Sequence, residues 1–306
     1  MKTPALTIFT PTYNRANTLH RLFASLKRQT CKDFEWLVIN DGSTDNTSEL
    51  FAGWLNEDVG FTIKYYEVNN GGKNRALNLG IQKACGEYFM ILDSDDLLTD
   101  DAVDFICQNM ADVAANDSFI GTSGRKGDLN GMPLGVSKKE YTEEGYIDCS
   151  NLERSQYNLQ RDMAEVFFTE KLRRYEFKVW EGEKFTPEEV VWNQMALDGY
   201  KLRWFNKVIY LCEYQQGGLS DSTWRLLRDN PMGYAMMFNQ RLLIENYLKG
   251  RLRNALQYGS CCILAKKPSM VFKSHTPFLT ALVSPISWML AARRRTQFKK
   301  YSGDKK

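Results

Sequence analysis

The chain has 306 residues, of which 43% are hydrophobic and 25% are charged. This length accommodates one large domain or two smaller ones, and the composition excludes a disordered, collagen-like or coiled-coil protein. The formal net charge is +3, but residues 293–306 hold seven Lys or Arg residues against one Asp. The near-neutral remainder lacks the broad basic face of a nucleic-acid-binding protein, so nucleic acid is not an expected partner.

Two kinds of segment alternate over the first 100 residues. Short apolar, β-branched runs predict strands, and apolar residues at 3.6-residue spacing predict helices between them. Strands are expected at 6–10, 36–39, 63–68 and 88–92, and helices from 17, from 43 or 44, and at 75–84. Pro11 is expected to end the first strand. The alternation predicts an α/β fold with a mainly parallel central sheet and flanking helices.

The pattern changes twice further along the chain. Residues 121–150 are rich in Gly, Lys and Glu and are interpreted as loops, whereas 165–215 return to mixed strands and helices. Beyond residue 220 the apolar spacing becomes helical. A domain boundary is therefore expected near residue 220.

Histidine and cysteine usage limits the chemistry. The two histidines lie 255 residues apart, which argues against a His-built zinc site and a Ser-His-Asp triad. The seven cysteines show no C-x-x-C spacing, so free thiols in a reducing compartment are expected. No apolar leader precedes the first strand, and a cytoplasmic location follows as the expectation.

A pair of carboxylates follows the strand at 88–92. In an extended segment, Asp93 and Asp95 point to the same side, and hard oxygens so placed suit Mg²⁺ or Mn²⁺ completed by substrate phosphates. Acidic residues after a strand also form turns and cap helices, a role open to Asp96 or Thr99. The D-x-D pattern alone leaves both interpretations open.

Other polar residues follow the first three predicted strands. Asp41 is placed to accept a hydrogen bond from a base or ribose, although an Asp-Gly turn explains it equally simply. Tyr13 and Arg15 are placed to stack on a base and to face a phosphate, and Lys73 and Arg75 add positive charge. The chain contains neither a P-loop nor a G-x-G-x-x-G fingerprint.

Glu188 and Glu189 follow Pro187 at the start of a predicted helix. Acidic residues in a first turn stabilise the helix dipole, which is the structural interpretation. The functional alternative is a general base that takes a proton from an attacking hydroxyl.

The C-terminal region carries an apolar stretch at 278–292 followed directly by three arginines. It is too short to span a bilayer and contains Pro285. An interfacial segment at 277–296, with Trp288 at head-group depth, is expected to make peripheral contact with the membrane. The alternative is a helix packed on the protein with a loose basic tail.

Four segments in this order resemble the nucleotide-binding half of the family 2 glycosyltransferases, which have the GT-A fold. They are Thr10–Arg15, Val38–Asp45, Asn70–Gly80 and Leu92–Asp96. The resemblance is strong over 1–115 and weaker over 165–220. It implies a catalytic domain at 1–220, with a nucleotide-binding half at 1–115 and an acceptor half at 116–220, followed by a helical region at 221–306.

The resemblance also implies roles for individual residues. Pro11, Thr12, Tyr13 and Asp41 would hold the nucleoside, and Lys73 or Arg75 would lie near the nucleotide. Asp93 would contact ribose or metal, and Asp95 would bind the divalent ion.

The family's acidic base falls in a Glu-Asp motif, and here Glu188-Glu189 takes its place, with Glu188 preferred. The departure from Glu-Asp leaves the base open between the two residues. Tyr214–Ser220 resembles the Gly-Leu-Ser stretch that ends the catalytic domain of bacterial surface-polysaccharide members.

The implied reaction is inverting transfer of a sugar from a nucleotide diphosphate, most simply UDP, to a hydroxyl of a glycan or lipid-linked acceptor. Cell-surface polysaccharide assembly, such as that of lipopolysaccharide, at the inner face of the cell membrane is the expected setting. Two alternatives are a sugar-phosphate nucleotidyltransferase and a non-catalytic, membrane-associated module that binds nucleotide sugars. The first would carry a Gly-rich basic loop after the first strand, where this chain has Pro11–Asn14.

Overall fold

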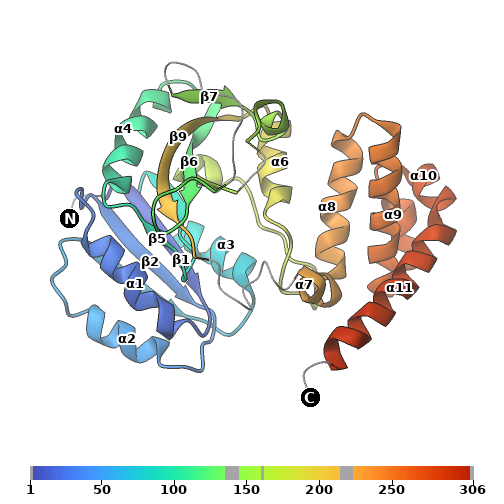
Figure 1. The fold of residues 1–306 in the computed structure, drawn as a ribbon, viewed down its shortest axis with the longest axis horizontal. Helices are drawn as coiled ribbons and strands as arrows, with labels where there is room; N and C mark the ends of the chain where they lie inside the picture. The colour runs from blue at the N-terminus through green and yellow to red at the C-terminus, as the bar shows by residue number, and fades with distance from the viewer. Residues whose placement is uncertain (1–2, 135–144, 160–161, 214–222, 304–306) are drawn as a thin grey trace. The chain divides into compact units, whose positions relative to one another are not determined.

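The computed structural model describes residues 3–134, 145–159, 162–213 and 223–303 (Figure 1). The chain forms two compact units, one made of Met1–Glu176 and Val191–Gln215, the other of Phe177–Val190 and Gln216–Lys306. The segment Phe177–Val190 thus lies with the helices of the second unit, while the predicted domain division at residue 220 stays a prediction. The Tyr214–Ser220 stretch lies outside the described residues.

A single mixed sheet forms the centre of the first unit. Over the described residues its strands are β1 (Leu6–Thr12), β2 (Phe34–Asn40), β3 (Thr62–Glu67), β4 (Tyr88–Ile91), β5 (Leu97–Leu98), β6 (Phe119–Gly127), β7 (Tyr146–Cys149), β8 (Met163–Phe168) and β9 (Lys201–Leu211). Their order is β3-β2-β1-β4-β8-β6-β9-β5, with β7 paired to β9. The strands β3, β2, β1 and β4 are parallel, β8 is antiparallel to β4 and β6, and β6 is parallel to β9. The predicted parallel arrangement therefore holds for the first four strands, and the rest of the sheet is mixed.

Helices flank the sheet as predicted. They are α1 (Ala16–Lys27), α2 (Thr47–Trp54), α3 (Lys73–Lys83), α4 (Ala102–Ala114), α5 (Thr169–Leu172) and α6 (Glu189–Leu197), with a short 3-10 helix at Arg154–Tyr157. The apolar stripe of α1 is fully buried, and α1, α2 and α4 share one core with the face of the sheet that carries Trp36. On the other face α3 approaches closely, since a Cβ at Gly80 would lie 2.3 Å from the Phe9 ring.

Two predictions about strands were wrong. Pro11 does not end the first strand, because β1 continues to Thr12 in register with β2. Proline has no backbone N–H to donate. Its nitrogen is on the side of β1 that faces β4, and the pairing of β1 with β4 has already ended at Phe9, so no hydrogen bond of the sheet is lost. The segment 121–150, which was expected to be loops, holds most of the nine-residue strand β6 and all of β7. The glycines of β6 are required by close neighbours: a Cβ at Gly121 would lie 1.9 Å from the carbonyl oxygen of Val166.

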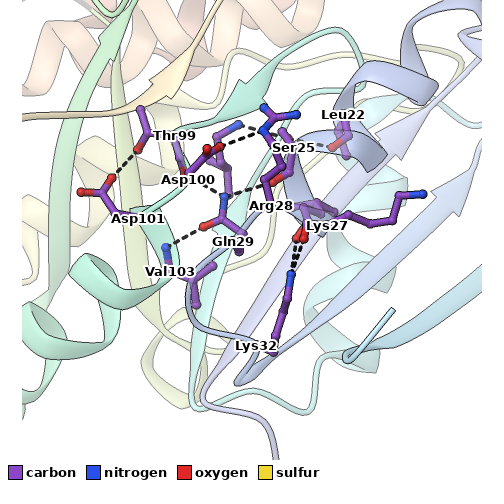
Figure 2. Close-up of polar contacts among 12 residues, drawn as sticks. Leu22, Ser25, Lys27, Arg28, Gln29, Lys32, Thr99, Asp100, Asp101 and Val103 are labelled. Atoms are coloured by element: carbon purple, nitrogen blue, oxygen red, sulfur yellow. Dashed lines mark hydrogen bonds and ion pairs between the residues drawn. The ribbon is translucent and has the colours of Figure 1, made fainter. Parts of the chain in front are cut away.

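A buried glutamine ties the end of α1 to the segment that enters α4 (Figure 2). Gln29 Nε2 donates to the carbonyl oxygens of Ser25 (3.2 Å) and Thr99 (2.7 Å), and Gln29 Oε1 accepts the N–H of Val103 (3.1 Å). Val103 lies in the first turn of α4, where backbone N–H groups have no partner within the helix. The side chain therefore fixes the path of the chain just after the acidic turn at 93–96.

We predict that Gln29→Ala lowers the free energy of unfolding by about 1–3 kcal/mol, because it leaves the buried Val103 N–H without its acceptor, while the Thr99 carbonyl still accepts the N–H of Ala102. Chemical denaturation measures the loss. The matched control is Gln108→Ala, since Gln108 is exposed and bonds only Asp104 among the contacts described for it (2.9 Å). Equal losses in the two variants would contradict the assigned role of Gln29.

The second unit is helical over its described residues 223–303, as the apolar spacing predicted. Its elements are α7 (Thr223–Asp229), α8 (Pro231–Ile244), α9 (Leu248–Leu264), η3 (Pro268–Lys273), α10 (Pro277–Leu282) and α11 (Ser284–Gly303). The apolar stretch at 278–292 is not one helix, because it is divided between α10 and α11. None of the helices in the described part of the chain is both long and apolar enough to cross a membrane.

The segment Phe177–Val190 is held to α8 by buried polar groups. The carboxylate of Glu183 accepts the N–H groups of Met232 (2.7 Å) and Gly233 (2.8 Å), two of the open donors in the first turn of α8. Burial raises the pKa of Glu183, although these two hydrogen bonds oppose the rise. Asn230 Oδ1 accepts the N–H groups of Lys184 and Phe185.

Candidate functional site

The predicted polar residues gather where the parallel strands end. Thr12 pairs with Asn40 at the ends of β1 and β2, and the Asp41 N–H donates to the Thr12 carbonyl (2.8 Å). On the other side of β1, the Leu92 N–H donates to the carbonyl of Phe9 (2.8 Å), just before Asp93. The loops after β1, β2 and β4 therefore share one edge of the sheet, where ligands bind in open α/β sheets.

The loops after β1 and β2 are joined by side chains. Asn14, at φ +52°, accepts the Thr44 N–H through Oδ1 (2.7 Å) and donates its own N–H to Ser43 Oγ (2.9 Å). Asp45 Oδ2 accepts the N–H of Ala16 at the start of α1 (3.0 Å). Burial would raise the pKa of Asp45, but hydrogen bonds from Thr47 and Ala16 hold it below its usual value.

Two nucleotide-binding candidates remain open toward a ligand in this arrangement. Tyr13 is 49% exposed, so its ring is accessible for stacking. Thr12 has a buried hydroxyl with no hydrogen-bond partner among the described residues. An unsatisfied buried group at the end of a strand is a position that a bound ligand would complete.

Asp41 is buried and organises the turn that precedes α3. Its two carboxylate oxygens accept the N–H groups of Gly71 (2.7 Å) and Gly72 (2.8 Å), and Asn70 Nδ2 donates to Oδ2 (3.1 Å). Gly42, at φ +73°, has no room for a side chain, because a Cβ would lie 2.9 Å from the Asn70 nitrogen. Asp41 thereby places the start of α3, and its contact with a nucleoside stays a prediction.

Lys73 and Arg75 differ in what they reach. Lys73 Nζ lies 2.8 Å from Asp93 Oδ1, whereas Arg75 donates to the carbonyl of Gly71 in its own turn. Arg15 lies 3.8 Å from Asp95 Oδ2. The structure therefore brings together four of the predicted residues as two ion pairs, Lys73 with Asp93 and Arg15 with Asp95.

Two carboxyl groups of the acidic turn, those of Asp93 and Asp96, have pKa values shifted in opposite directions. Burial would raise the pKa of Asp93, but the charges of Lys73, Lys126 and Arg15 bring this pKa below its usual value. Burial and the negative charge of Asp93 raise the pKa of Asp96 to about 6. Asp93 is therefore a stable anion, while Asp96 carries its charge less readily.

The turn fits a divalent ion of the Mg²⁺ or Mn²⁺ type. Asp93 and Asp95 supply hard oxygen donors at an edge that is also lined by cations. The described residues include no cluster of three or more His, Cys, Asp or Glu side chains able to hold a metal by themselves. This donor set matches ions that complete their coordination with water and substrate phosphates.

Sequence reasoning missed the side chains that support this turn. The Tyr210 hydroxyl accepts the N–H of Asp93 (3.0 Å) and donates to Asp96 Oδ2 (2.8 Å). Lys126 Nζ lies 4.4 Å from the centroid of the Tyr210 ring. Burial would lower the pKa of Lys126, but the carboxylates of Asp93, Asp96 and Glu165 raise it. Tyr210 looked like part of an apolar strand and Lys126 like part of a loop, and no spacing links either residue to Asp93.

We predict that Tyr210→Phe weakens binding of a nucleotide with Mn²⁺ by about tenfold, because the turn loses the hydrogen bonds of the hydroxyl to the Asp93 N–H and to the Asp96 carboxylate. Calorimetry measures the affinity. The matched control is Tyr258→Phe, which removes a buried hydroxyl that donates to the Met270 carbonyl (2.6 Å) in the second unit. Weaker binding in both variants alike would contradict a specific role for Tyr210.

Glu188 and Glu189 belong to the second unit. Both carboxylate oxygens of Glu189 accept hydrogen bonds from the Arg241 guanidinium, each at 2.6 Å. Arg241 lies near the end of α8, and the neighbouring Gln240 donates to the carbonyl of Val190 (2.8 Å). Glu189 is therefore committed to a bidentate ion pair within its own unit.

Known proteins match this chain in sequence. The model of the family described as "Glycosyl transferase family 2" matches residues 7–143. A Streptococcus pneumoniae glycosyltransferase, GlyA, is 28% identical over 70% of this chain and 31% of its own length. A Campylobacter jejuni GalNAc(5)-diNAcBac-PP-undecaprenol beta-1,3-glucosyltransferase is 27% identical over 62% of this chain and 59% of its own. The chain spans less than two thirds of the length of each of these curated relatives.

Solved structures match the fold. Staphylococcus aureus TarS 1–349 in complex with UDP-GlcNAc superposes with a TM-score of 0.62 at 15% identity, covering 95% of this chain and 91% of that one. A Pyrobaculum calidifontis mannosyltransferase in complex with GDP-Man and Mn²⁺ gives 0.55 at 18% identity, covering 97% and 84%. The family match thus identifies residues 7–143 as a glycosyl transferase family 2 region, and the structural similarities show that the chain has the GT-A fold.

Proposed function

We propose that the protein is an inverting glycosyltransferase that moves a sugar from a nucleotide diphosphate, UDP in the first instance, to a hydroxyl of an acceptor. The observation that carries the proposal is the acidic turn at 93–96, set at the carboxyl edge of the parallel strands with Lys73 and Arg15 beside it. Such an edge offers both oxygen donors for a cation and cations for a diphosphate. The UDP-GlcNAc and GDP-Man in the similar structures support a nucleotide-sugar donor, and the first of them supports UDP.

Asp95 and Asp93 would hold a Mg²⁺ or Mn²⁺ ion. Bound there, the ion would stabilise negative charge on the departing nucleoside diphosphate. The chain's own part is to orient the donor: Thr12 and Tyr13 toward the nucleoside, and Lys73 and Arg15 toward the phosphates. Asp41 would contact the nucleoside and also holds the turn before α3, whereas Tyr210 acts indirectly by holding the acidic turn.

Glu188 is the proposed base that takes the proton of the acceptor hydroxyl as the oxygen attacks the sugar. A single displacement of this kind inverts the anomeric carbon. Both oxygens of Glu189 accept hydrogen bonds from the Arg241 guanidinium, which supports a structural role for this residue.

The proposed acceptor is a glycan or a lipid-linked sugar in cell-surface polysaccharide synthesis, handled at the cytoplasmic face of the membrane. The undecaprenol-linked substrate in the name of the Campylobacter jejuni relative supports a lipid-linked acceptor. The proposed peripheral contact runs through the C-terminal segment at 277–296, where apolar and basic residues lie side by side in sequence.

Calorimetric titration tests the donor half of the proposal. UDP, GDP and dTDP are each titrated into the full chain, with Mn²⁺ and again with EDTA. We expect one nucleotide to bind, and only with the ion. Binding of none of them under either condition would reject the transferase proposal and leave the fold without this activity.

A further inference from the structure

Positive charge is concentrated in the helical residues 223–303. Residues 223–303 contain fourteen Lys or Arg residues and two acidic residues, a net charge of +12 in a protein whose total is +3. The two acids are both engaged: Asp229 pairs with Arg228 (2.6 Å), and Glu245 accepts the N–H of Tyr247 (2.9 Å). The basic character therefore extends through residues 223–303 rather than being confined to the end of the chain, and it favours a negatively charged partner.

The same unit also concentrates exposed apolar side chains. Ten of the sixteen large hydrophobic residues that are exposed in the described part of the chain fall within 223–303. A folded surface that is both strongly basic and apolar differs from a nucleic-acid-binding face, which is basic but polar. The combination is typical of surfaces that enter the head-group region of an anionic membrane.

The exposed apolar residues gather at one end of the helices. Leu242 of α8, Ala255 of α9 and Val283 between α10 and α11 share a small buried cluster, which brings the α8–α9 turn close to α10 (Figure 1). Around this cluster the solvent-facing side chains are large and apolar. We call these residues the apolar end: Leu243, Tyr247, Leu248, Phe278, Leu282, Ile286 and Met289, which are 55% to 91% exposed.

The orientation of α11 is fixed by its buried stripe. Ser287 Oγ donates to the carbonyl of Leu256 (3.2 Å), and it lies so close to Gly259 that a Cβ there would be 2.6 Å away. Two turns further along α11, the buried Arg294 donates to Ser260 Oγ (3.1 Å). These contacts hold one face of α11 against α9 and therefore determine which residues face outward.

The outward face of α11 changes character along its axis. Ile286 and Met289 are exposed in its first two turns, and Arg293 and Lys300 continue the same stripe as exposed basic residues. On α9, exposed Lys249 and Arg253 likewise follow Leu248. The apolar end is thus bordered by cations on both helices, an arrangement complementary to a lipid surface with phosphate groups above acyl chains.

We infer that the apolar end inserts into the head-group and upper acyl region of an anionic bilayer, with Lys249, Arg253 and Arg293 on the lipid phosphates. The inference rests on the proposed membrane contact and changes its geometry. The contact is the end of a helical unit, entering to a depth of about 5–10 Å, rather than a single helix lying flat over 277–296. It also adds the α8–α9 turn, which lies outside the segment expected from sequence.

Vesicle sedimentation of the full chain tests the inference. Phosphatidylcholine vesicles with and without phosphatidylglycerol are used at low salt and at about 0.5 M salt. We expect binding to the phosphatidylglycerol vesicles, partly retained at high salt. Leu282→Glu/Met289→Glu should weaken it by about tenfold or more. The matched control is Leu129→Glu/Met132→Glu, two exposed apolar residues of the first unit.

The charge half of the inference has its own pair of variants. Lys249→Gln/Arg293→Gln should weaken binding to phosphatidylglycerol vesicles by about tenfold. The control Lys83→Gln/Arg174→Gln removes two exposed cations of the first unit and should leave binding unchanged. Thermal melting checks that every variant folds.

Several outcomes would overturn the inference. They are no vesicle binding by the unaltered chain, equal binding by Leu282→Glu/Met289→Glu, and complete loss of binding at high salt, which would indicate purely electrostatic adsorption. A dimer in gel filtration that dissociates in the Glu variant, without any lipid binding, would assign the apolar end to a second copy. Nucleotide calorimetry on the same samples separates the two proposals, because vesicle binding without nucleotide binding removes the transferase and keeps the membrane contact.

Discussion

Asp95→Ala is expected to abolish the dependence of nucleotide binding on Mn²⁺ and to lower kcat/KM for sugar transfer by about a thousandfold. The reason is that the turn would retain one carboxylate, Asp93, already paired with Lys73 at 2.8 Å. Loss of preorganised electrostatic stabilisation typically costs about 10²–10³ in rate. Calorimetry with Mn²⁺ and with EDTA measures the first effect, and transfer kinetics measure the second.

Asp100→Ala is the matched control for this experiment. Asp100 lies five residues further along, is exposed, and pairs with Arg28 (3.0 Å), much as Asp95 pairs with Arg15. The control removes a carboxylate that pairs with an arginine, from the same stretch of chain, and leaves the acidic turn unchanged. If Asp95→Ala kept Mn²⁺-dependent binding while Asp100→Ala lost it, the assignment of the ion to the turn would be wrong.

The second large effect is expected at the paired glutamates. Glu188→Gln should lower kcat by about a thousandfold, the size of general-base effects, while leaving affinity for the donor nucleotide unchanged. Glu189→Gln should lower the free energy of unfolding by about 0.5–1 kcal/mol, because the partly exposed Arg241 guanidinium loses a charged partner. Transfer kinetics and chemical denaturation on both variants separate the two roles.

The comparison is its own control, since the two residues are adjacent and carry the same substitution. A large fall in kcat for Glu189→Gln with little change for Glu188→Gln would reverse the assignment. A loss of nucleotide affinity in both would instead indicate that this segment supports the donor site. Equal, unchanged kcat in both would remove the pair from catalysis altogether.

The strands that were predicted well share one property. Those near 36–39 and 88–92 are runs of consecutive apolar residues, because they are covered by helices on both faces of a parallel sheet. β6 has Gly121, Ser123 and Gly124 where such a run would be apolar, so its sequence looked like a loop. What makes β6 a strand is its two neighbours in the sheet, and these come from residues 163–168 and 201–211, far along the chain.

In the candidate site, too, some residues could be located from the sequence and others could not. The places of Asp41, Asp93 and Asp95 were predictable because Asp41 directly follows β2, Asp93 and Asp95 lie just after β4, and the ends of parallel strands meet at one edge. The role of Tyr210 was not predictable, since its hydroxyl accepts a hydrogen bond from the Asp93 N–H, 117 residues away in the sequence. The contacts of Lys73 and Arg75 were also beyond the sequence, since Lys73 pairs with Asp93 whereas Arg75 donates to the Gly71 carbonyl.

The linked loops at the strand ends have a consequence for the energetics of donor capture. Asn14, Asp41 and Asp45 join three separate loops through hydrogen bonds to the N–H groups of Thr44, Gly71, Gly72 and Ala16. Because these loops are already held together, they have little conformational freedom to lose, so nucleotide binding should carry a small entropic penalty. Those four amide protons should accordingly exchange slowly with deuterium before any nucleotide is added, unlike the protons of an untethered loop.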